Sequence, residues 1–138
     1  MAGRRTLARQ SALQALYQWQ MTGQTPAEIE RQFLDDPEAG DFERSLFHEL
    51  LHGVPAHLGE LDASLGSLLD RPVEQVDPVE RAILRLGAYE LLRSPELPYR
   101  VVINEAVDLA KRFGAEQGHR YVNGVLDKLA RRTRAAEM

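Results

Sequence analysis

Apolar residues recur along this chain with the spacing of α-helices. Side chains at i, i+3, i+4 and i+7 share one face of a helix, whereas alternation of apolar and polar residues is typical of a half-buried strand. The helical spacing occurs repeatedly, and no segment alternates convincingly. Helices are expected at about 6–22, 26–34, 42–54, 57–69 and 78–93, with two more between 98 and 129. The sequence therefore predicts an all-α protein.

The stretch between Pro98 and Leu129 holds two helical patterns joined by a short polar loop. We expect Gly114 to end the first helix in a left-handed conformation. The apolar spacing continues through Asn123-Gly124, so we expect a helix there rather than a hairpin turn, with Gly124 at a close helix crossing. A plain core hairpin with solvated charges accounts for the apolar positions. The sharper hypothesis adds a polyanion-binding corner formed by Lys111, Arg112, Gln117, His119, Arg120 and Tyr121.

Helix starts are signalled at two places. Thr25 and Asp77 each precede a proline at the first helical position and a glutamate at the third, which is a typical capping pattern. Gly87 lies inside the helix that Asp77 begins. Because glycine costs about 1 kcal/mol there relative to alanine, we expect a close contact at Gly87. Residues 131–138 lack periodicity and are expected to fray.

Charge is distributed unevenly along the chain. The net charge is −4, yet residues 1–27 and 99–138 each carry +3, residues 28–62 carry −8, and residues 63–98 carry −2. An acidic protein is not a general nucleic-acid binder. If the basic ends meet in the fold, however, they form one face that can hold phosphates while the remaining surface discourages nonspecific binding.

Three arginines begin the first helix, namely Arg4, Arg5 and Arg9. Positive charge at a helix N-terminus opposes the helix dipole, so these residues are not placed there for helix stability. They are candidates for binding, and the alternative is a ragged terminus with solvated arginines. Tyr17 and Trp19, further along this helix, fit core or half-core positions better than stacking platforms.

One short string matches an enzyme motif. His48-Glu49-Leu50-Leu51-His52 has the H-E-x-x-H spacing of zinc proteases. Both histidines point away from the apolar stripe of their helix, and the extended motif lacks its third ligand. No phosphate loop and no nucleophile with a base at readable spacing is present. We therefore expect no enzyme activity, no catalytic metal and no cofactor.

Composition narrows the class of protein further. The 138 residues are 43% apolar, which suits a single globular domain with a real core. The absence of cysteine excludes disulfides and thiolate metal sites, and it fits a reducing compartment. No apolar run approaches the roughly 20 residues needed to cross a bilayer. We expect a cytoplasmic protein without a membrane segment.

Several longer blocks resemble the NusB family of bacterial transcription antitermination factors. They lie at 12–20, 79–86 and 89–91, and the most specific spans 98–129, with Ile103-Asn104-Glu105-Ala106 and Tyr121-Val122-Asn123-Gly124. The resemblance covers nearly the whole chain. It implies an all-α fold of about seven helices in two packed helical subdomains, forming a single domain over 1–138. The N-terminal half is expected at about 1–70 and the C-terminal half at about 76–134.

The resemblance also implies a function. NusB-like proteins bind the boxA element of nascent ribosomal RNA transcripts together with a small-subunit ribosomal protein, which doubles as NusE. The complex then joins other Nus factors on RNA polymerase and suppresses termination. The RNA surface implied for this chain comprises Arg4, Arg5, Arg9, Lys111, Gln117, His119, Arg120 and Tyr121. The implied NusE contact comprises Tyr17, Glu80, Arg81 and Arg85.

The residue types agree with this implication. Single-stranded RNA recognition needs phosphate contacts, donors to base edges and a flat side chain for stacking. The N-terminal arginines suit the first role, Gln14, Gln117 and Arg120 the second, and Tyr121 or His119 the third. Thr6 and Leu7 stand where some relatives have further arginines, which reduces the charge. Glu80 has two interpretations, as a helix-capping residue or as a carboxylate that pairs with a basic partner.

Two alternatives come from other classes. NusB-like domains also occur as regulatory domains attached to ribosomal RNA cytosine methyltransferases, and this chain has no room for the methyltransferase domain itself. A dimeric helical adaptor without an RNA role is the other, because some NusB-like proteins form homodimers. Binding of a boxA-type RNA with and without the ribosomal protein would separate these hypotheses.

Overall fold

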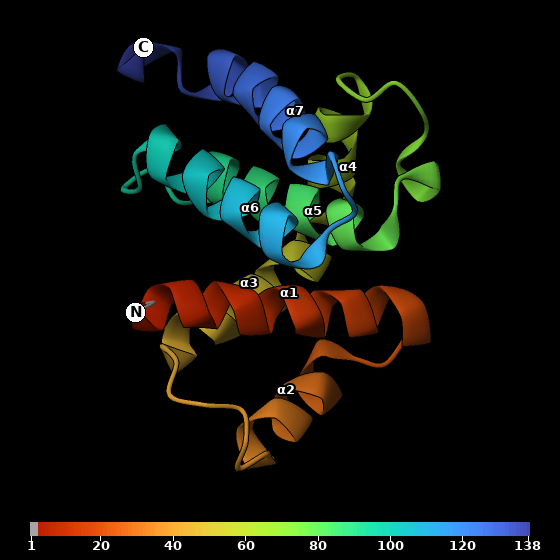
Figure 1. Ribbon diagram of the computed structural model, residues 1–138, viewed down its shortest axis with the longest axis vertical. Coiled ribbons are helices and arrows are strands. Elements are labelled where there is room, and N and C mark those ends of the chain that lie inside the picture. The colour runs from red at the N-terminus through yellow and green to blue at the C-terminus, as the bar shows by residue number, and fades with distance from the viewer. Residues whose placement is uncertain (1–2) are drawn as a thin grey trace. The chain divides into compact units, whose positions relative to one another are not determined.

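The computed structural model describes residues 3–138, and every regular element in that range is helical, as the sequence predicts (Figure 1). The helices are joined by short loops, and two of the elements are single turns of 3-10 helix. The elements are α1 (Arg4–Thr22), α2 (Pro26–Asp35), α3 (Arg44–Ala56), α4 (Leu58–Gly66), η1 (Val73–Gln75), α5 (Pro78–Arg93), α6 (Tyr99–Phe113), α7 (Gly118–Thr133) and η2 (Ala135–Glu137).

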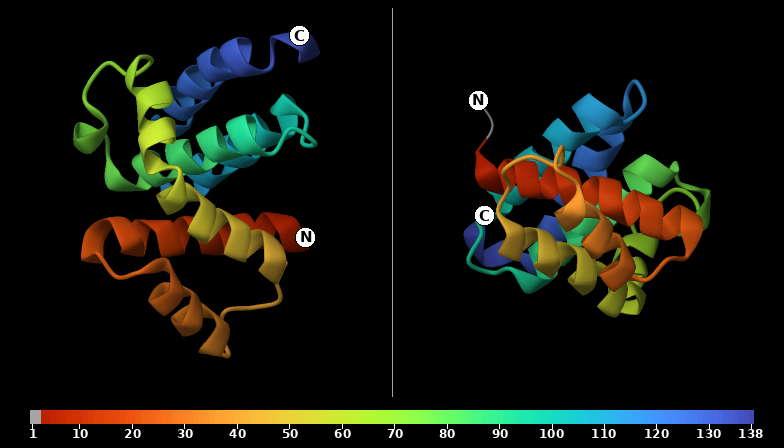
Figure 2. Two further views of the ribbon diagram at one scale, coloured as in Figure 1. Left: turned by 180° about the vertical axis from the view of Figure 1, so that it is seen from behind. Right: turned by 90° about the horizontal axis from the view of Figure 1, so that it is seen from below.

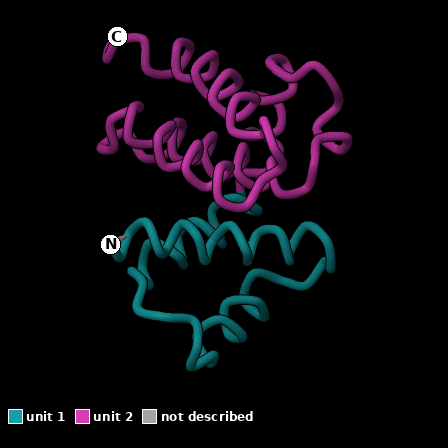
Figure 3. The backbone as a smooth tube through the Cα atoms, in the orientation of Figure 1, with its two compact units in different colours: residues 1–56 teal, residues 57–138 magenta. Residues whose placement is uncertain are grey.

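The helices fall into two compact units (Figure 3). The first unit ends at Ala56 and contains α1 to α3, and the second begins at His57 and contains α4 to α7 with both 3-10 helices. We expected the N-terminal half to extend to about residue 70. The division falls earlier because α4 packs against α5 and therefore belongs with the second unit.

The first unit is built on the packing of α1 against α3, with α2 beside both (Figures 1 and 2). α2 contributes one fully buried residue, Ile29, to this core. The ring of Phe33 on α2 also lies 5.5 Å from that of Phe47 on α3. The predicted cap is confirmed, since Thr25 Oγ1 accepts the Glu28 N–H at 3.2 Å and donates to the Glu28 carboxylate at 3.0 Å.

The second unit is organised around α5, which α4, α6 and α7 contact from different sides (Figures 1 and 2). Every residue from Ala82 to Leu91 is buried. Gly87 allows α7 to approach, because a Cβ at that position would lie 2.7 Å from Leu126 Cδ1. The predicted close contact is thus confirmed. The Asp77 carboxylate caps α5 by accepting the N–H groups of Val79 and Glu80.

Two glycine predictions are wrong. Gly114 ends α6 with φ −86°, and Gln117 at φ 73° takes the left-handed conformation instead. Gly114 lacks a side chain for steric reasons, since a Cβ there would lie 2.8 Å from the Ala110 carbonyl oxygen. Gly124 lies inside α7 as expected, but it is exposed and no atom approaches within 4 Å of its Cβ position. It is therefore not at a helix crossing.

The prediction that the C-terminal segment frays is wrong. α7 continues to Thr133, and η2 follows it. Arg134 between them is only 6% exposed, and its guanidinium donates to the carbonyl oxygens of Leu91 at 2.9 Å and Leu97 at 2.7 Å. It also donates to the carbonyl oxygens of Glu90 and Ser94. A buried arginine therefore anchors the segment to the end of α5.

Candidate nucleic-acid interface

The N-terminal arginines have three different environments. Arg4 Nε lies 3.3 Å from Asp41 Oδ1, and its guanidinium donates to the Phe42 carbonyl oxygen at 3.1 Å. Arg5 is exposed. Arg9 is only 2% exposed, so this placement does not fit the hypothesis that it contacts phosphate. Of the three, Arg5 presents its charge to solvent most directly.

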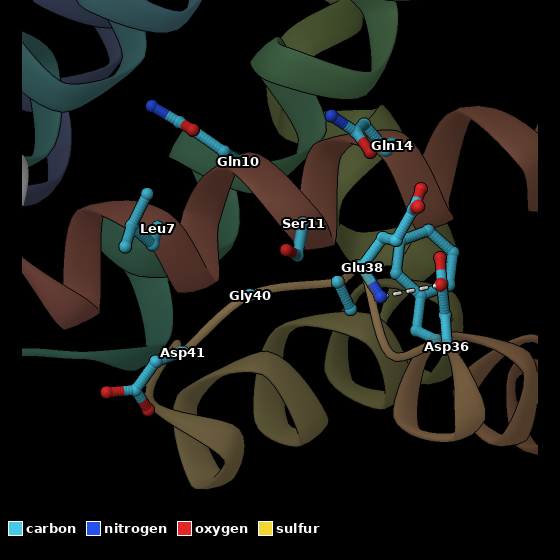
Figure 4. Close-up of a pocket in the computed structure, with 10 residues that line it drawn as sticks. Leu7, Gln10, Ser11, Gln14, Asp36, Glu38, Gly40 and Asp41 are labelled. Atoms are coloured by element: carbon cyan, nitrogen blue, oxygen red, sulfur yellow. Dashed lines mark hydrogen bonds between the residues drawn. The ribbon is translucent and has the colours of Figure 1, made fainter.

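A pocket lies between α1 and the loop that follows α2 (Figure 4). Gln14 is exposed on α1 and lines it, as do Gln10 and Ser11. The loop contributes the acids at the opposite side, and Asp36 Oδ1 accepts the Glu38 N–H at 2.9 Å. Because carboxylates repel phosphates, this pocket suits amide and hydroxyl contacts to a base rather than contacts to an RNA backbone.

The predicted corner between α6 and α7 forms in the second unit. Lys111, Gln117 and Arg120 are exposed, and His119 and Tyr121 are half-buried. The loop is held at its base, where the Ala115 carbonyl oxygen accepts the Gly118 N–H at 2.9 Å. The corner and the N-terminal arginines belong to different compact units. Their union in a single basic face stays a prediction.

Tyr121 is held by two residues of the loop before η1. Its hydroxyl lies 3.2 Å from Asp70 Oδ1, and the Arg71 guanidinium lies over its ring, 5.2 Å from the centroid. Arg71 also forms a bidentate pair with Asp70, at 2.8 and 2.9 Å. Burial and the neighbouring Asp70 carboxylate raise the pKa of Tyr121, so it stays protonated at neutral pH. Arg71 thus covers one face of the ring, and stacking of Tyr121 on a base stays a prediction.

A hollow beside Tyr121 adds Lys128, which was not among the predicted site residues. The hollow is lined by Arg120, Tyr121, Gly124, Val125 and Lys128 of α7, together with Leu68 and Asp70. Arg120, Gly124 and Lys128 are spaced at i, i+4 and i+8, so they lie along one exposed face of α7. This spacing is visible in the sequence and could have identified Lys128 as a candidate site residue. Gly124 lies between the two cations on this face.

The residues expected to contact a protein partner differ in accessibility. Tyr17 is 39% exposed, so it is not a core residue, whereas Trp19 is half-buried as expected. Arg81 is half-buried, and its Nη1 donates to the Glu74 carbonyl oxygen at 3.1 Å. Arg85 is 8% exposed and holds Asp62 of α4 through two contacts, at 3.0 and 2.9 Å. This interaction suits a structural role, because it links α4 to α5.

Glu80 is also buried, at 8% exposure. Its carboxylate does not complete a reciprocal capping box but lies against the start of α7, where it accepts the Ala115 N–H. Burial raises the pKa of Glu80, and the charge of Asp77 adds to this effect, while the Ala115 hydrogen bond and Arg71 oppose it. The partner contact through Glu80 stays a prediction, and this placement favours a structural role.

The two histidines of the H-E-x-x-H string point outward, as expected, but they are not isolated. His48 and His52 both lie against Glu30 of α2. These three residues form the single group of potential metal ligands found between residues 3 and 138. Glu30 was not predicted to join the histidines, because it is distant from them along the chain and belongs to no motif.

No helix in the described part of the chain is both long enough and apolar enough to cross a membrane. The fold and the exposed cations, aromatic rings and amides define a class, namely a small all-α protein whose surface suits contacts with RNA or another protein. Comparison with known proteins agrees with this class. The sequence profile of the NusB family matches residues 6–131. The chain therefore belongs to the NusB family.

Individual relatives are similar over most of their length. The transcription antitermination protein NusB of Nitrosococcus oceani is 59% identical over 99% of this chain and 92% of its own. The protein of the same name from Alkalilimnicola ehrlichii is 58% identical, over 92% of this chain and 81% of its own.

Solved structures show the same fold. NusB from T. maritima matches with a TM-score of 0.83 and 29% identity, over 95% of this chain and 93% of its own. A structure of the antitermination factors NusB and NusE in complex with dsRNA matches with a TM-score of 0.80 and 28% identity, over 96% of this chain and 99% of the matching one.

Proposed function

We propose that this protein is a transcription antitermination factor that binds boxA-type RNA of nascent ribosomal RNA transcripts together with the ribosomal protein NusE. The observation that carries the proposal is the near full-length similarity, at 59% identity, to a relative that is named for this function. The solved NusB and NusE complex with dsRNA supports both partners. Other Nus factors and RNA polymerase are contacted indirectly, through this complex.

The α7 hollow carries side chains that suit RNA binding. Arg120 and Lys128 line it and suit contacts with phosphates, while the exposed Gln117 amide can donate to a base edge. Tyr121 and His119 are the flat side chains for base stacking. Unpaired bases can reach such groups, whereas bases inside an A-form duplex cannot, so we propose a single-stranded element as the target.

The N-terminal segment adds contacts of a different kind. Arg5 is exposed and supplies charge, and Arg4 contributes less because it is paired with Asp41. Gln14 lies in a pocket lined with acids, so we assign it to base contacts. Arg9 is left out of the proposed surface because it is buried.

NusE contacts are proposed separately for Tyr17 in the first unit and for the accessible part of Arg81 in the second. Tyrosine is enriched in protein interfaces because its ring is apolar and its hydroxyl polar, and Tyr17 is one of the few exposed large hydrophobic side chains. Glu80 and Arg85 would support the Arg81 contact from within the second unit, by fixing α5 against α7 and α4. Self-association of the free protein stays an expectation.

The proposal is tested by titrating a boxA-type RNA with this protein, alone and with NusE, over a series of salt concentrations. We expect binding that weakens as salt increases and strengthens when NusE is present. An RNA of equal length and scrambled sequence serves as the control. Equal affinity for both RNAs, with and without NusE, would contradict the proposal. Binding of neither RNA would favour a dimeric helical adaptor without an RNA role.

A further inference from the structure

α2 and α3 together place three metal-ligating side chains at one point of the first unit. His48 and His52 are one turn apart on α3, and their rings stack with centroids 4.2 Å apart and an interplanar angle of 27°. Glu30 comes from the facing side of α2. His48 Nδ1 lies 2.7 Å from Glu30 Oε2, and His52 Nε2 lies 2.8 Å from Glu30 Oε1.

We propose that Glu30, His48 and His52 form a binding site for a divalent transition-metal ion, with zinc as the ion that the ligand set fits. Two imidazoles and a carboxylate are a common set for zinc. Calcium and magnesium prefer oxygen ligands alone, and copper(I) prefers thiolates, which this chain lacks. The proposal is independent of the RNA-binding function.

The geometry allows such a site with small movements. One ligand atom from each residue can be chosen so that all three lie within 4.8 Å of one another. Tetrahedral zinc has ligands at about 2.0–2.2 Å, which places neighbouring ligand atoms about 3.4 Å apart. The present nitrogen–oxygen contacts of 2.7 and 2.8 Å must therefore open slightly. The side chain of His48 is 59% exposed, so its rotation is unhindered by core packing.

The atoms that face one another in the cluster are atoms that metals bind. His48 Nδ1 and His52 Nε2 both lie against the carboxylate oxygens of Glu30. Imidazole nitrogens and carboxylate oxygens are both common zinc ligands. Water would complete the coordination, because the site opens to solvent.

A metal at this point would connect α2 to α3. α2 is short and buries only Ile29 completely, so an added link should stabilise its position. The ion is not expected to be catalytic. Glu49, which would act as the base in a zinc protease, is exposed and is not part of the ligand group. The proposed role is structural.

Isothermal titration of the chelator-treated protein with zinc chloride tests the proposal. We expect one zinc per chain and a rise in melting temperature when zinc is added. Residues that only orient a metal ligand by hydrogen bonding typically contribute about ten- to a hundredfold to metal affinity. Removal of a ligand in Glu30→Gln or His48→Ala should therefore weaken zinc binding by at least about tenfold.

Two matched variants serve as controls. Glu49→Gln changes a neighbouring exposed glutamate, and His119→Ala removes a histidine of the second unit, so both should bind zinc like the wild type. Each variant is melted without zinc to show that it is folded. If Glu30→Gln does not fold, His48→Ala provides the test, because His48 is exposed. Absence of zinc binding by the wild type, or equal affinity in a folded His48→Ala variant, would overturn the proposal.

Discussion

The carboxylate of Glu80 fills the space in which a side chain at position 118 would lie. A Cβ on Gly118 would be 2.5 Å from Glu80 Oε2 and 2.9 Å from Glu80 Cδ. This contact joins the first turn of α5 to the start of α7, and the Glu80 carboxylate accepts the Ala115 N–H beside it. The glutamate and the glycine therefore define the corner between α6 and α7 together.

Gly118→Ala should destabilise the fold, because the added methyl group must displace a buried carboxylate. We expect a decrease of about 1–3 kcal/mol in the free energy of unfolding. Gly124→Ala on the same helix is the matched control. No atom lies near its Cβ position, so alanine there should stabilise by about 0.5–1 kcal/mol. Urea denaturation of the three proteins measures both changes, and equal effects would contradict the proposed contact.

Glu80 should also make stability depend on pH. Its pKa is raised in the folded chain, so the folded state holds the proton more tightly than the unfolded state does. The stability that this provides is present below the ordinary value of 4.5 and is lost as pH rises through the raised pKa. Relative to the wild type, Glu80→Gln should therefore gain stability across that interval. The exposed Glu74→Gln variant should show no such gain in the same series of denaturation curves.

Replacing Arg134 should unfold part of the second unit or strongly lower the free energy of unfolding. Its guanidinium bonds four carbonyl oxygens near the end of α5. Because each buried polar group left unsatisfied costs about 1–3 kcal/mol, we expect Arg134→Met to cost about 3 kcal/mol overall. Arg131→Ala removes an exposed arginine from α7 and should change stability by less than about 0.5 kcal/mol. Similar melting temperatures for the two variants would contradict the anchoring role.

RNA binding should depend on Arg5, Arg120 and Lys128 through salt. Removing one cation that touches a phosphate is expected to flatten the plot of log affinity against log salt by roughly 0.7 for single strands. Alanine at each position should therefore weaken binding and lower this slope. Arg93→Ala is the control, since Arg93 is an exposed arginine of α5 paired with Glu60. If none of the three variants differs from Arg93→Ala while all remain folded, the proposed RNA surface is wrong.

Tyr121 should act through its ring. Tyr121→Phe removes the hydroxyl that meets Asp70 and should cost at most about 1 kcal/mol of stability, with RNA affinity nearly unchanged. Tyr121→Ala should weaken RNA binding by about 1–3 kcal/mol without a change in salt slope. Melting temperatures measured beside the RNA titrations separate stacking from misfolding. The Tyr121→Ala variant could bind less RNA only because less of it is folded. That result would argue against stacking.

Local features of the fold were predictable from the sequence. Helix positions follow from apolar spacing, and the caps at Thr25 and Asp77 follow from residues within one turn of each other. The close contact at Gly87 was predictable because glycine is costly inside a helix. The polar corner between α6 and α7 was predictable too, since a short loop necessarily keeps its flanking residues close together.

Contacts between distant segments required the tertiary structure. Tyr121 and Asp70 are 51 residues apart, and Arg134 is more than 35 residues from the carbonyl groups that it bonds. The burial of Arg9 and the grouping of Glu30 with His48 are likewise invisible to periodicity. Helical spacing depends on neighbours three or four residues away, and it therefore identifies which face of a helix is polar. Only the packing of one helix on another determines what that polar face meets.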